Sequence, residues 1–239
     1  MKQIWVISKR ELQSFFDSLT AYIMLVAFLG FSGLFTWLYG QDIFFVKQAS
    51  LQAFFGVAYW TLFFFIPALT MRQFAEENKT GTIELLLTRP INDWQVVIGK
   101  FLATLLLIVI ALAFTIPYYI TVANLGNIDH GATLTGYLGL ILISASYISI
   151  GIFTSSISNN QIVGFLLALA IGILFHFLFS FLASGATGLV GDILYYLSIS
   201  THFESISRGV IDSKDLVFFL SLIFLGLVST EAVLKRNRN

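Results

Sequence analysis

Ionisable side chains are nearly absent from the apolar stretches of this sequence, which limits the chemistry that it can perform. His176 is the one such residue deep within a stretch. Glu231 lies near the end of the last stretch, four residues before Lys235, a spacing typical of a helical ion pair. The sequence holds no His-Glu-x-x-His motif, no pair of aspartates within the stretches and no serine–histidine couple at a useful spacing. Because a lone histidine is more often a packing residue than a catalyst, we do not expect an enzyme.

The sequence also lacks the groups that bind nucleotides, thiolate-held metals or nucleic acids. It has no Gly-x-x-x-x-Gly-Lys-[Ser/Thr] phosphate loop, and Gly99-Lys100 is followed by Phe101 without the upstream glycine. Cys is absent, which excludes disulfides, iron–sulfur clusters and thiolate zinc sites. The 13 basic and 13 acidic residues balance, so no basic footprint for a nucleic acid is visible. We therefore expect this chain to bind no cofactor and to take its energy from another protein.

Long stretches without Asp, Glu, Lys or Arg decide the fold class. Hydrophobic residues make up 57% of the chain and charged residues only 11%, whereas soluble domains carry roughly 25% charged residues. A helix that crosses the hydrocarbon layer needs roughly 20 apolar residues. The sequence predicts an all-α polytopic membrane protein, a single domain over 1–239 with six transmembrane helices. These are expected at about 21–40, 51–71, 98–123, 133–155, 161–183 and 216–234.

The basic residues predict the orientation of these spans. Six crossings place both termini on one side of the membrane, and ten of the 13 basic residues fall on that side. They are Lys2, Lys9, Arg10, Arg72, Lys79, Arg89, Lys100, Lys235, Arg236 and Arg238. Since basic residues favour the cytoplasmic side, we expect both termini in the cytoplasm. The segment 184–215 is then an external loop, with a short apolar patch that dips into or lies along the outer leaflet.

The segment before the first span is expected to form an amphipathic helix over 1–19. Its apolar residues recur at helical spacing and alternate with charged and polar residues. The apolar set is Ile4, Trp5, Leu12, Phe15, Phe16 and Leu19, and the polar set is Lys9, Arg10, Gln13 and Asp17. Such a helix lies in the membrane interface. The alternative is a solvated N-terminal tail.

The cytoplasmic loop over 72–97 is the most charged segment of the chain. Gly81 is expected to interrupt a helix that extends from the second span. Thr82 then begins a short new helix with Glu84 in its first turn, where the helix dipole favours a carboxylate. The leucines that follow make this helix apolar on at least one side, and Pro90 ends it.

Asn92, two residues after Pro90, and Gln95, three residues further on, resemble a capping arrangement that opens the third span. The loop therefore forms either a stiff acidic and apolar knob that presses into a groove on a partner, or an interfacial turn that only seals the helix ends. The residues by themselves leave both interpretations open.

Two patterns carry a resemblance to a known family. The first is Glu77-x-x-x-Gly81-Thr82-x-Glu84-x-Leu86-Leu87-x-x-Pro90, followed by Gly99-Lys100. The second is His202-Phe203-Glu204 with Arg208-Gly209-Val210-Ile211-Asp212, before the last span. With the six spans and the amphipathic N-terminus, the whole chain resembles the ABC-2 family of permeases. Within that family it resembles the branch of gliding-motility-associated permeases, which is related to the permease of nitrous-oxide-reductase copper maturation.

The resemblance implies a function that the residues by themselves do not give. Two permease chains, identical or related, would pair in a bacterial inner membrane and dock two separate ABC ATPase subunits, which use ATP and Mg. The segment after Gly81 would be the coupling helix that transmits closure of the ATPase subunits and switches the transport cavity. Contact with the ATPase would involve Glu76, Glu77, Gly81, Thr82, Glu84, Leu86, Leu87 and Pro90. The resemblance names no substrate.

A non-transporting membrane scaffold that anchors a motility or secretion assembly is the alternative function. It shares the six spans with an exporter but needs no alternating cavity. Stimulation of ATP hydrolysis by a substrate in reconstituted vesicles separates the two. Neither interpretation involves a nucleic acid.

Overall fold

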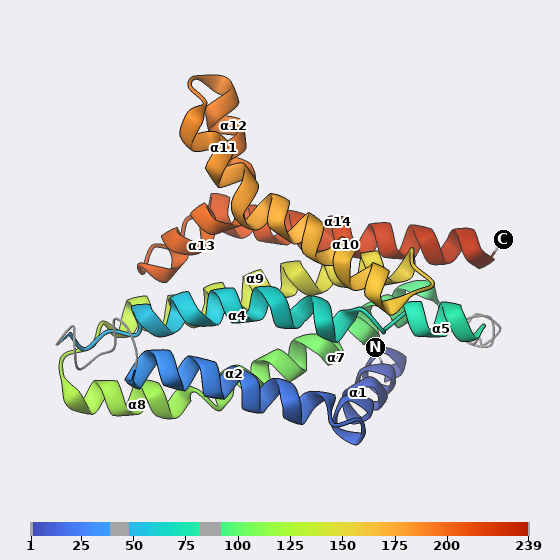
Figure 1. Cartoon of the computed structure of the whole chain (residues 1–239), viewed down its shortest axis with the longest axis horizontal. Coiled ribbons are helices and arrows are strands. Elements are labelled where there is room, and N and C mark those ends of the chain that lie inside the picture. The colour runs from blue at the N-terminus through green and yellow to red at the C-terminus, as the bar shows by residue number, and fades with distance from the viewer. Residues whose placement is uncertain (1, 39–47, 82–91, 239) are drawn as a thin grey trace.

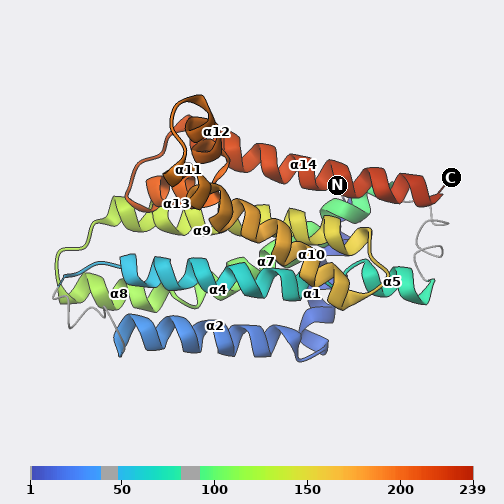
Figure 2. The same ribbon diagram turned by 45° about the horizontal axis from the view of Figure 1, so that its top comes forward.

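The computed structural model describes residues 2–38, 48–81 and 92–238. Within these ranges every regular element is a helix, which confirms the all-α fold class. Six of the helical stretches are long and apolar enough to cross a membrane, as the sequence predicts. Figures 1 and 2 show them as an elongated bundle whose long axis follows the helices.

Each crossing stretch overlaps an expected range, but the second ends at Thr80 instead of 71 and the third begins at Asp93 instead of 98. Three of the stretches are built from more than one helix. The first is α2 (Thr20–Trp37), and the second, Gln52–Thr80, joins α4 (Gln52–Thr70) to α5 (Ala75–Thr80). The third joins α7 (Asp93–Ala113) to α8 (Ile116–Leu125), and the fourth is α9 (His130–Ser156). The fifth joins α10 (Gln161–Ile173), the π-helical turn η1 (Leu174–Leu178) and α11 (Phe179–Gly185), and the sixth is α14 (Ser213–Arg238).

Helix α9 lies at the centre of the bundle. It packs against α4, α7, α10 and α14, and 78% of its most apolar window is buried, against 22% for the fifth and sixth stretches. Small residues make this packing close: a Cβ added to Gly226 of α14 would lie 2.7 Å from the Ser149 hydroxyl of α9. In the absence of a hydrophobic force between helices in lipid, such close backbone contact is a main source of helix association.

The N-terminal helix α1 (Lys2–Asp17) forms as expected and packs across the start of α7. Leu19, with φ of 37°, makes the sharp turn by which the chain leaves α1 and enters α2 (Figure 1). Gly99 allows α1 to approach α7, because a Cβ there would lie 2.6 Å from Ile7 Cγ2. The Ser8 hydroxyl donates to the Gly99 carbonyl at 2.9 Å and fixes the register of the two helices.

The segment 184–215, expected as a loop, contains two helices, α12 (Leu189–Leu197) and α13 (Ile199–Ser207). The expected apolar patch lies on α12, which projects with α11 from the bundle (Figure 1). In α13, buried His202 Nδ1 lies 2.6 Å from buried Asp215 Oδ1, and its Nε2 lies 2.9 Å from the Tyr196 carbonyl. These contacts fasten α13 to α12 and α14.

Candidate functional site

Gly81 ends α5 in the left-handed conformation, with φ of 69°, which glycine adopts without steric cost. A helix extending from the second span is thus interrupted at Gly81, as expected. The expected coupling helix after it lies outside the described residues, and so do five of the proposed contact residues: Thr82, Glu84, Leu86, Leu87 and Pro90.

The third span opens with the expected cap but begins earlier than position 98. Asn92 Oδ1 accepts from the Trp94 amide at 3.3 Å, and Gln95 Oε1 accepts from the Asn92 amide at 3.2 Å. These two reciprocal bonds satisfy amides at the helix end, so α7 begins at Asp93. The earlier start places Lys100 two turns inside the helix.

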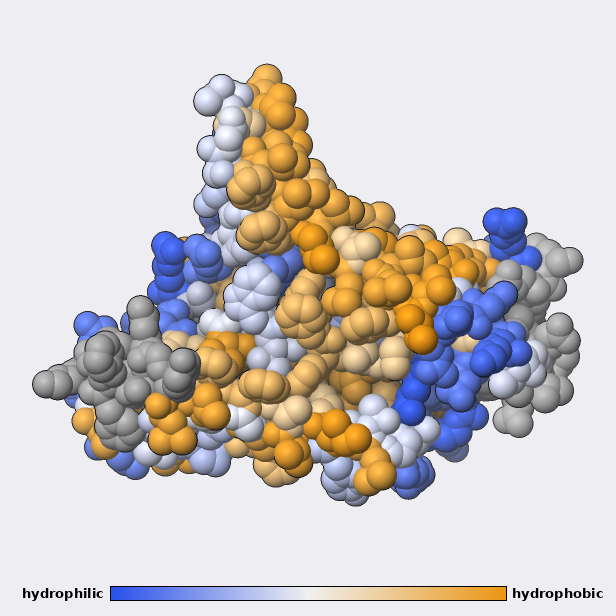
Figure 3. Space-filling view, in the orientation of Figure 1, coloured by the Kyte–Doolittle hydropathy of each residue, from blue (hydrophilic) through white to orange (hydrophobic). Residues whose placement is uncertain are grey.

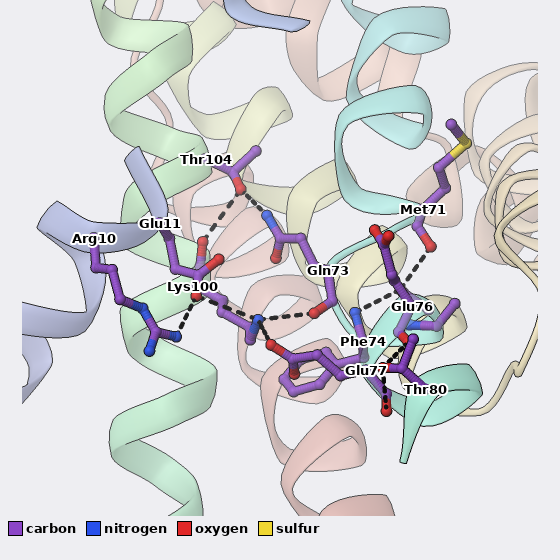
Figure 4. Close-up of polar contacts among 12 residues, drawn as sticks. Arg10, Glu11, Met71, Gln73, Phe74, Glu76, Glu77, Thr80, Lys100 and Thr104 are labelled. Carbon is purple, nitrogen blue, oxygen red and sulfur yellow. Dashed lines mark hydrogen bonds and ion pairs between the residues drawn. The ribbon is translucent and has the colours of Figure 1, made fainter. Parts of the chain in front are cut away.

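Lys100 is the centre of a buried polar cluster between α1, α5 and α7 (Figure 4). Its side chain is 1% exposed. Nζ donates to Glu77 Oε1 at 2.7 Å and to the Gln73 carbonyl at 2.8 Å, and lies 3.5 Å from Glu11 Oε1. We define these four residues, Glu11, Gln73, Glu77 and Lys100, as the Lys100 cluster. The sequence predicts Glu77 as a contact residue for the ATPase, and its pairing with Lys100 beside Glu11 was not predicted.

The cluster compensates for the cost of burying an ammonium group. An unpaired buried charge costs several kcal/mol, and an ammonium has three N–H donors to satisfy. Glu77, Gln73 and Glu11 supply three acceptors, and the Phe74 ring lies 5.0 Å from Nζ in cation–π geometry. Because the acceptors come from three segments, a single ammonium on α7 holds α1, the turn before α5 and α5 itself together.

Glu11 contributes from α1 as a carboxylate. Burial acts to raise its pKa, but the Lys100 ammonium and the Arg10 guanidinium, 2.8 Å from Glu11 Oε1, outweigh burial and lower the pKa below its usual 4.5. Glu11 is therefore ionised at neutral pH and pairs with both cations. Its link to Lys100 ties the interfacial helix to the third span.

A second set of contacts fastens α5 to the end of α9. The Ser155 hydroxyl accepts from the amides of Phe74 and Ala75, both at 3.1 Å, and donates to the Met71 carbonyl at 2.9 Å. The Asn78 amide group donates to the Ser156 carbonyl at 3.0 Å. Unpaired groups at the ends of α4, α5 and α9 are thus satisfied.

The polar residues 155–161 are expected to form the turn between the fourth and fifth spans. They do so, since α9 ends at Ser156 and α10 begins at Gln161. Their second role, in anchoring α5, was missed because the partners lie some 80 positions away in the sequence.

A cavity of about 580 Å³ opens beside the Lys100 cluster, and its nine lining residues are of mixed charge. Glu76, exposed on α5, lies at this cavity, whereas Glu77 points its Oε1 to Lys100. Glu77 Oε2 is buried and has no hydrogen-bond partner among the described residues. Of the proposed contact residues within the described part of the chain, Glu76 is therefore accessible to a partner, whereas Glu77 is held in the cluster.

His176, the one ionisable residue expected deep in a span, lies in η1 and is buried. Its Nδ1 is hydrogen-bonded to the Tyr147 hydroxyl, and its ring stacks on Tyr59 with centroids 4.1 Å apart. These contacts describe a packing residue. Within the described ranges no cluster of three metal-ligating side chains is found. Glu231 and Lys235 form no ion pair there either, so the helical ion pair that their spacing indicates is absent.

Replacing Lys100 with Met should destabilise the protein by about 3 kcal/mol, because it leaves Glu77 as a buried carboxylate without its cation. Adding Glu77→Gln should restore part of this loss, because the unpaired charge is then removed. Unfolding midpoints in a mild detergent measure both effects. Lys79→Met, at an exposed position of α5, is the matched control and should shift stability by less than about 0.5 kcal/mol. A Lys100→Met protein as stable as the parent would contradict the role of the cluster.

Glu11→Gln should change how the free energy of unfolding depends on pH in the acidic range. Because the folded-state pKa of Glu11 is lowered, its contribution is fully present above the unfolded pKa, near 4.5, and is lost as pH falls through the folded value. We expect the parent to be more stable than Glu11→Gln by about 1 kcal/mol at pH 7, the upper value for partly exposed pairs. The two unfolding curves should converge once the pH lies below the lowered folded-state pKa of Glu11, because its carboxyl is then protonated in both states. If the stabilities of the parent and of Glu11→Gln differ by the same amount at every pH, the ion pairs of Glu11 do not contribute to stability.

Comparison with known proteins identifies the family. A family model described as "ABC-2 family transporter protein" matches residues 5–228, which include the first five crossing stretches, most of the sixth and the Lys100 cluster. A search of curated proteins finds no match to the chain. Members of this family are membrane transport subunits of ABC transporters and work with an ABC ATPase subunit. The chain, a multi-pass membrane protein with six apolar crossing helices, therefore belongs to the ABC-2 transporter family.

Proposed function

We propose that this chain is the permease subunit of an ATP-driven exporter whose ATPase is a separate protein that docks at α5. The observation that carries the proposal is the Lys100 cluster, which joins the start of the cytoplasmic loop over 72–97 to α1 and α7. A force applied to the segment after Gly81 would reach the interfacial helix α1 and the transmembrane helix α7 through short polar contacts. The exposed Glu76 and the residues 82–90 would form the contact with the ATPase.

The transmission that we propose is a rigid-body movement. The cluster and the bonds of Ser155 and Asn78 connect α5 with α7 and α9, so these helices would tilt together when the ATPase subunits close. Such a tilt would switch the access of a transport cavity between the two sides of the membrane. The substrate is recognised elsewhere, because the cluster satisfies its own charges.

Pairing with a second permease chain would complete the transport path. In the single chain, the most apolar window of α2 is only 33% buried, and those of the fifth and sixth stretches are 22% buried each. The corresponding window of α9 is 78% buried. These exposed apolar faces are available to lipid and to a second, identical or related permease. We place both termini in the cytoplasm of a bacterial cell, because the charge distribution favours this side for α1, α5 and the end of α14.

Three variants separate binding of the ATPase from transmission of its movement. We expect the parent chain to hydrolyse no ATP by itself and to co-purify with an ATPase expressed beside it. Glu84→Lys and Glu76→Lys should weaken this co-purification, because they reverse charges at the proposed contact. Lys100→Met should leave co-purification intact but reduce stimulation of the ATPase by about tenfold, the effect of roughly 1.4 kcal/mol of lost coupling.

Arg208→Gln is the control and should behave as the parent, because Arg208 is exposed and directly follows α13, which lies toward the other end of the bundle from α5 (Figure 1). Full transport by a chain purified without any ATPase would contradict the proposal. If the chain co-purifies with the ATPase but neither the chain nor any substrate stimulates ATP hydrolysis, the scaffold function is favoured instead.

A further inference from the structure

Arg72, just after α4, carries a charge that the Lys100 cluster does not use. Its Nη2 donates to the Ser18 hydroxyl at 2.7 Å, and its guanidinium lies 5.6 Å from the centroid of the Phe15 ring. Among the described residues no carboxylate forms an ion pair with Arg72. A guanidinium has five N–H donors, so most of its hydrogen-bonding capacity remains for a ligand.

The charge balance around Arg72 favours an anionic ligand. Arg72 lines the 580 Å³ cavity together with three carboxylates, Glu11, Glu76 and Glu77. Glu11 and Glu77 are paired with Lys100, and Glu11 is paired with Arg10 as well. Glu76 is exposed on α5 and is therefore screened by solvent. The cavity thus offers Arg72 as its cation without a paired carboxylate.

An apolar groove of about 250 Å³ lies between α2 and α4. Its lining is Thr20, Ile23, Met24, Ala27, Phe65, Ala68 and Leu69. The small side chains of Ala27 and Ala68 leave the room that makes the groove. From Thr20 to Ala27 a helix rises about 10 Å, which covers most of the roughly 15 Å of hydrocarbon in one leaflet. The groove therefore has the length and polarity for the upper part of one acyl chain.

The cation and the groove are joined at one corner of the protein. Arg72 donates to Ser18, and the Ser18 hydroxyl donates to the Thr20 hydroxyl at 3.0 Å. Thr20 begins the lining of the groove, and Leu69, one turn before Arg72, lines it from the other side. Figure 3 shows hydrophilic residues gathered at this end of the bundle, directly against the broad hydrophobic surface of its middle.

We propose that this corner binds an anionic phospholipid from the leaflet at this end of the bundle, with its phosphate at Arg72 and one acyl chain in the groove between α2 and α4. A cation at headgroup depth attracts anionic lipids, and the groove selects a ligand that also has a chain. The site goes beyond the proposed function and does not depend on an ATPase. It would lock the corner between α1 and α2, beside the Lys100 cluster, to the membrane.

Lipid binding to the purified full-length protein in a neutral detergent tests this site. Phosphatidylglycerol and phosphatidylcholine with identical chains are added separately, and bound lipid is counted by native mass spectrometry. We expect the parent to prefer phosphatidylglycerol and Arg72→Gln to bind it about tenfold more weakly, as the loss of a charge-assisted hydrogen bond implies. Arg72→Lys should retain part of the preference, because it keeps the charge. Ala68→Phe should weaken binding of phosphatidylglycerol with Arg72 intact, because it fills the groove.

Arg208→Gln removes an exposed arginine directly after α13, away from the groove, and should bind phosphatidylglycerol as the parent does. Undiminished binding by Arg72→Gln would overturn the headgroup site, and undiminished binding by Ala68→Phe would overturn the acyl groove. Glycerol phosphate serves as a chainless probe in a competition arm. If it displaces phosphatidylglycerol at equal concentration, the ligand is a free phosphate and the lipid site is wrong.

Discussion

Burying an ammonium group costs several kcal/mol unless acceptors satisfy its donors, and this constraint shapes one end of the protein. Lys100 meets it with acceptors from α1, from the turn before α5 and from α5 itself. Each acceptor is useful only while its segment stays in place. The three segments are therefore held in one arrangement, although few residues join them.

Helix packing and hydrogen bonds elsewhere in the bundle stabilise this arrangement. Helix α9 packs against α4, α7, α10 and α14, and its terminal Ser155 and Ser156 hold α5 through hydrogen bonds to backbone and to Asn78. Gly99, directly before Lys100, allows α1 to lie close enough for Glu11 to reach the ammonium. Close packing and the polar cluster thus depend on each other, and both favour movement of the helices as rigid bodies.

Local sequence patterns predicted the parts of this architecture that local physics controls. The length of the apolar stretches gave the six crossings, Gly81 marked a helix end, and Asn92 with Gln95 marked a helix start. The Lys100 cluster was missed because Glu77, Gln73 and Glu11 lie 23, 27 and 89 positions before Lys100 and no periodicity links them. The signal that could have found it was a lysine inside an apolar helix, which requires an acceptor somewhere in the fold.

The chain has no cysteine, so spin labels can be placed at chosen positions without removing native thiols. The most direct test of the central claim is the distance between labels at exposed Lys9 of α1 and exposed Lys79 of α5, measured by pulsed electron paramagnetic resonance. The measurement uses the complex with its ATPase, with and without ATP. The account predicts the same narrow distance distribution in both states and a broader one after Lys100→Met. A distance that changes with ATP while Lys100 is intact would contradict it.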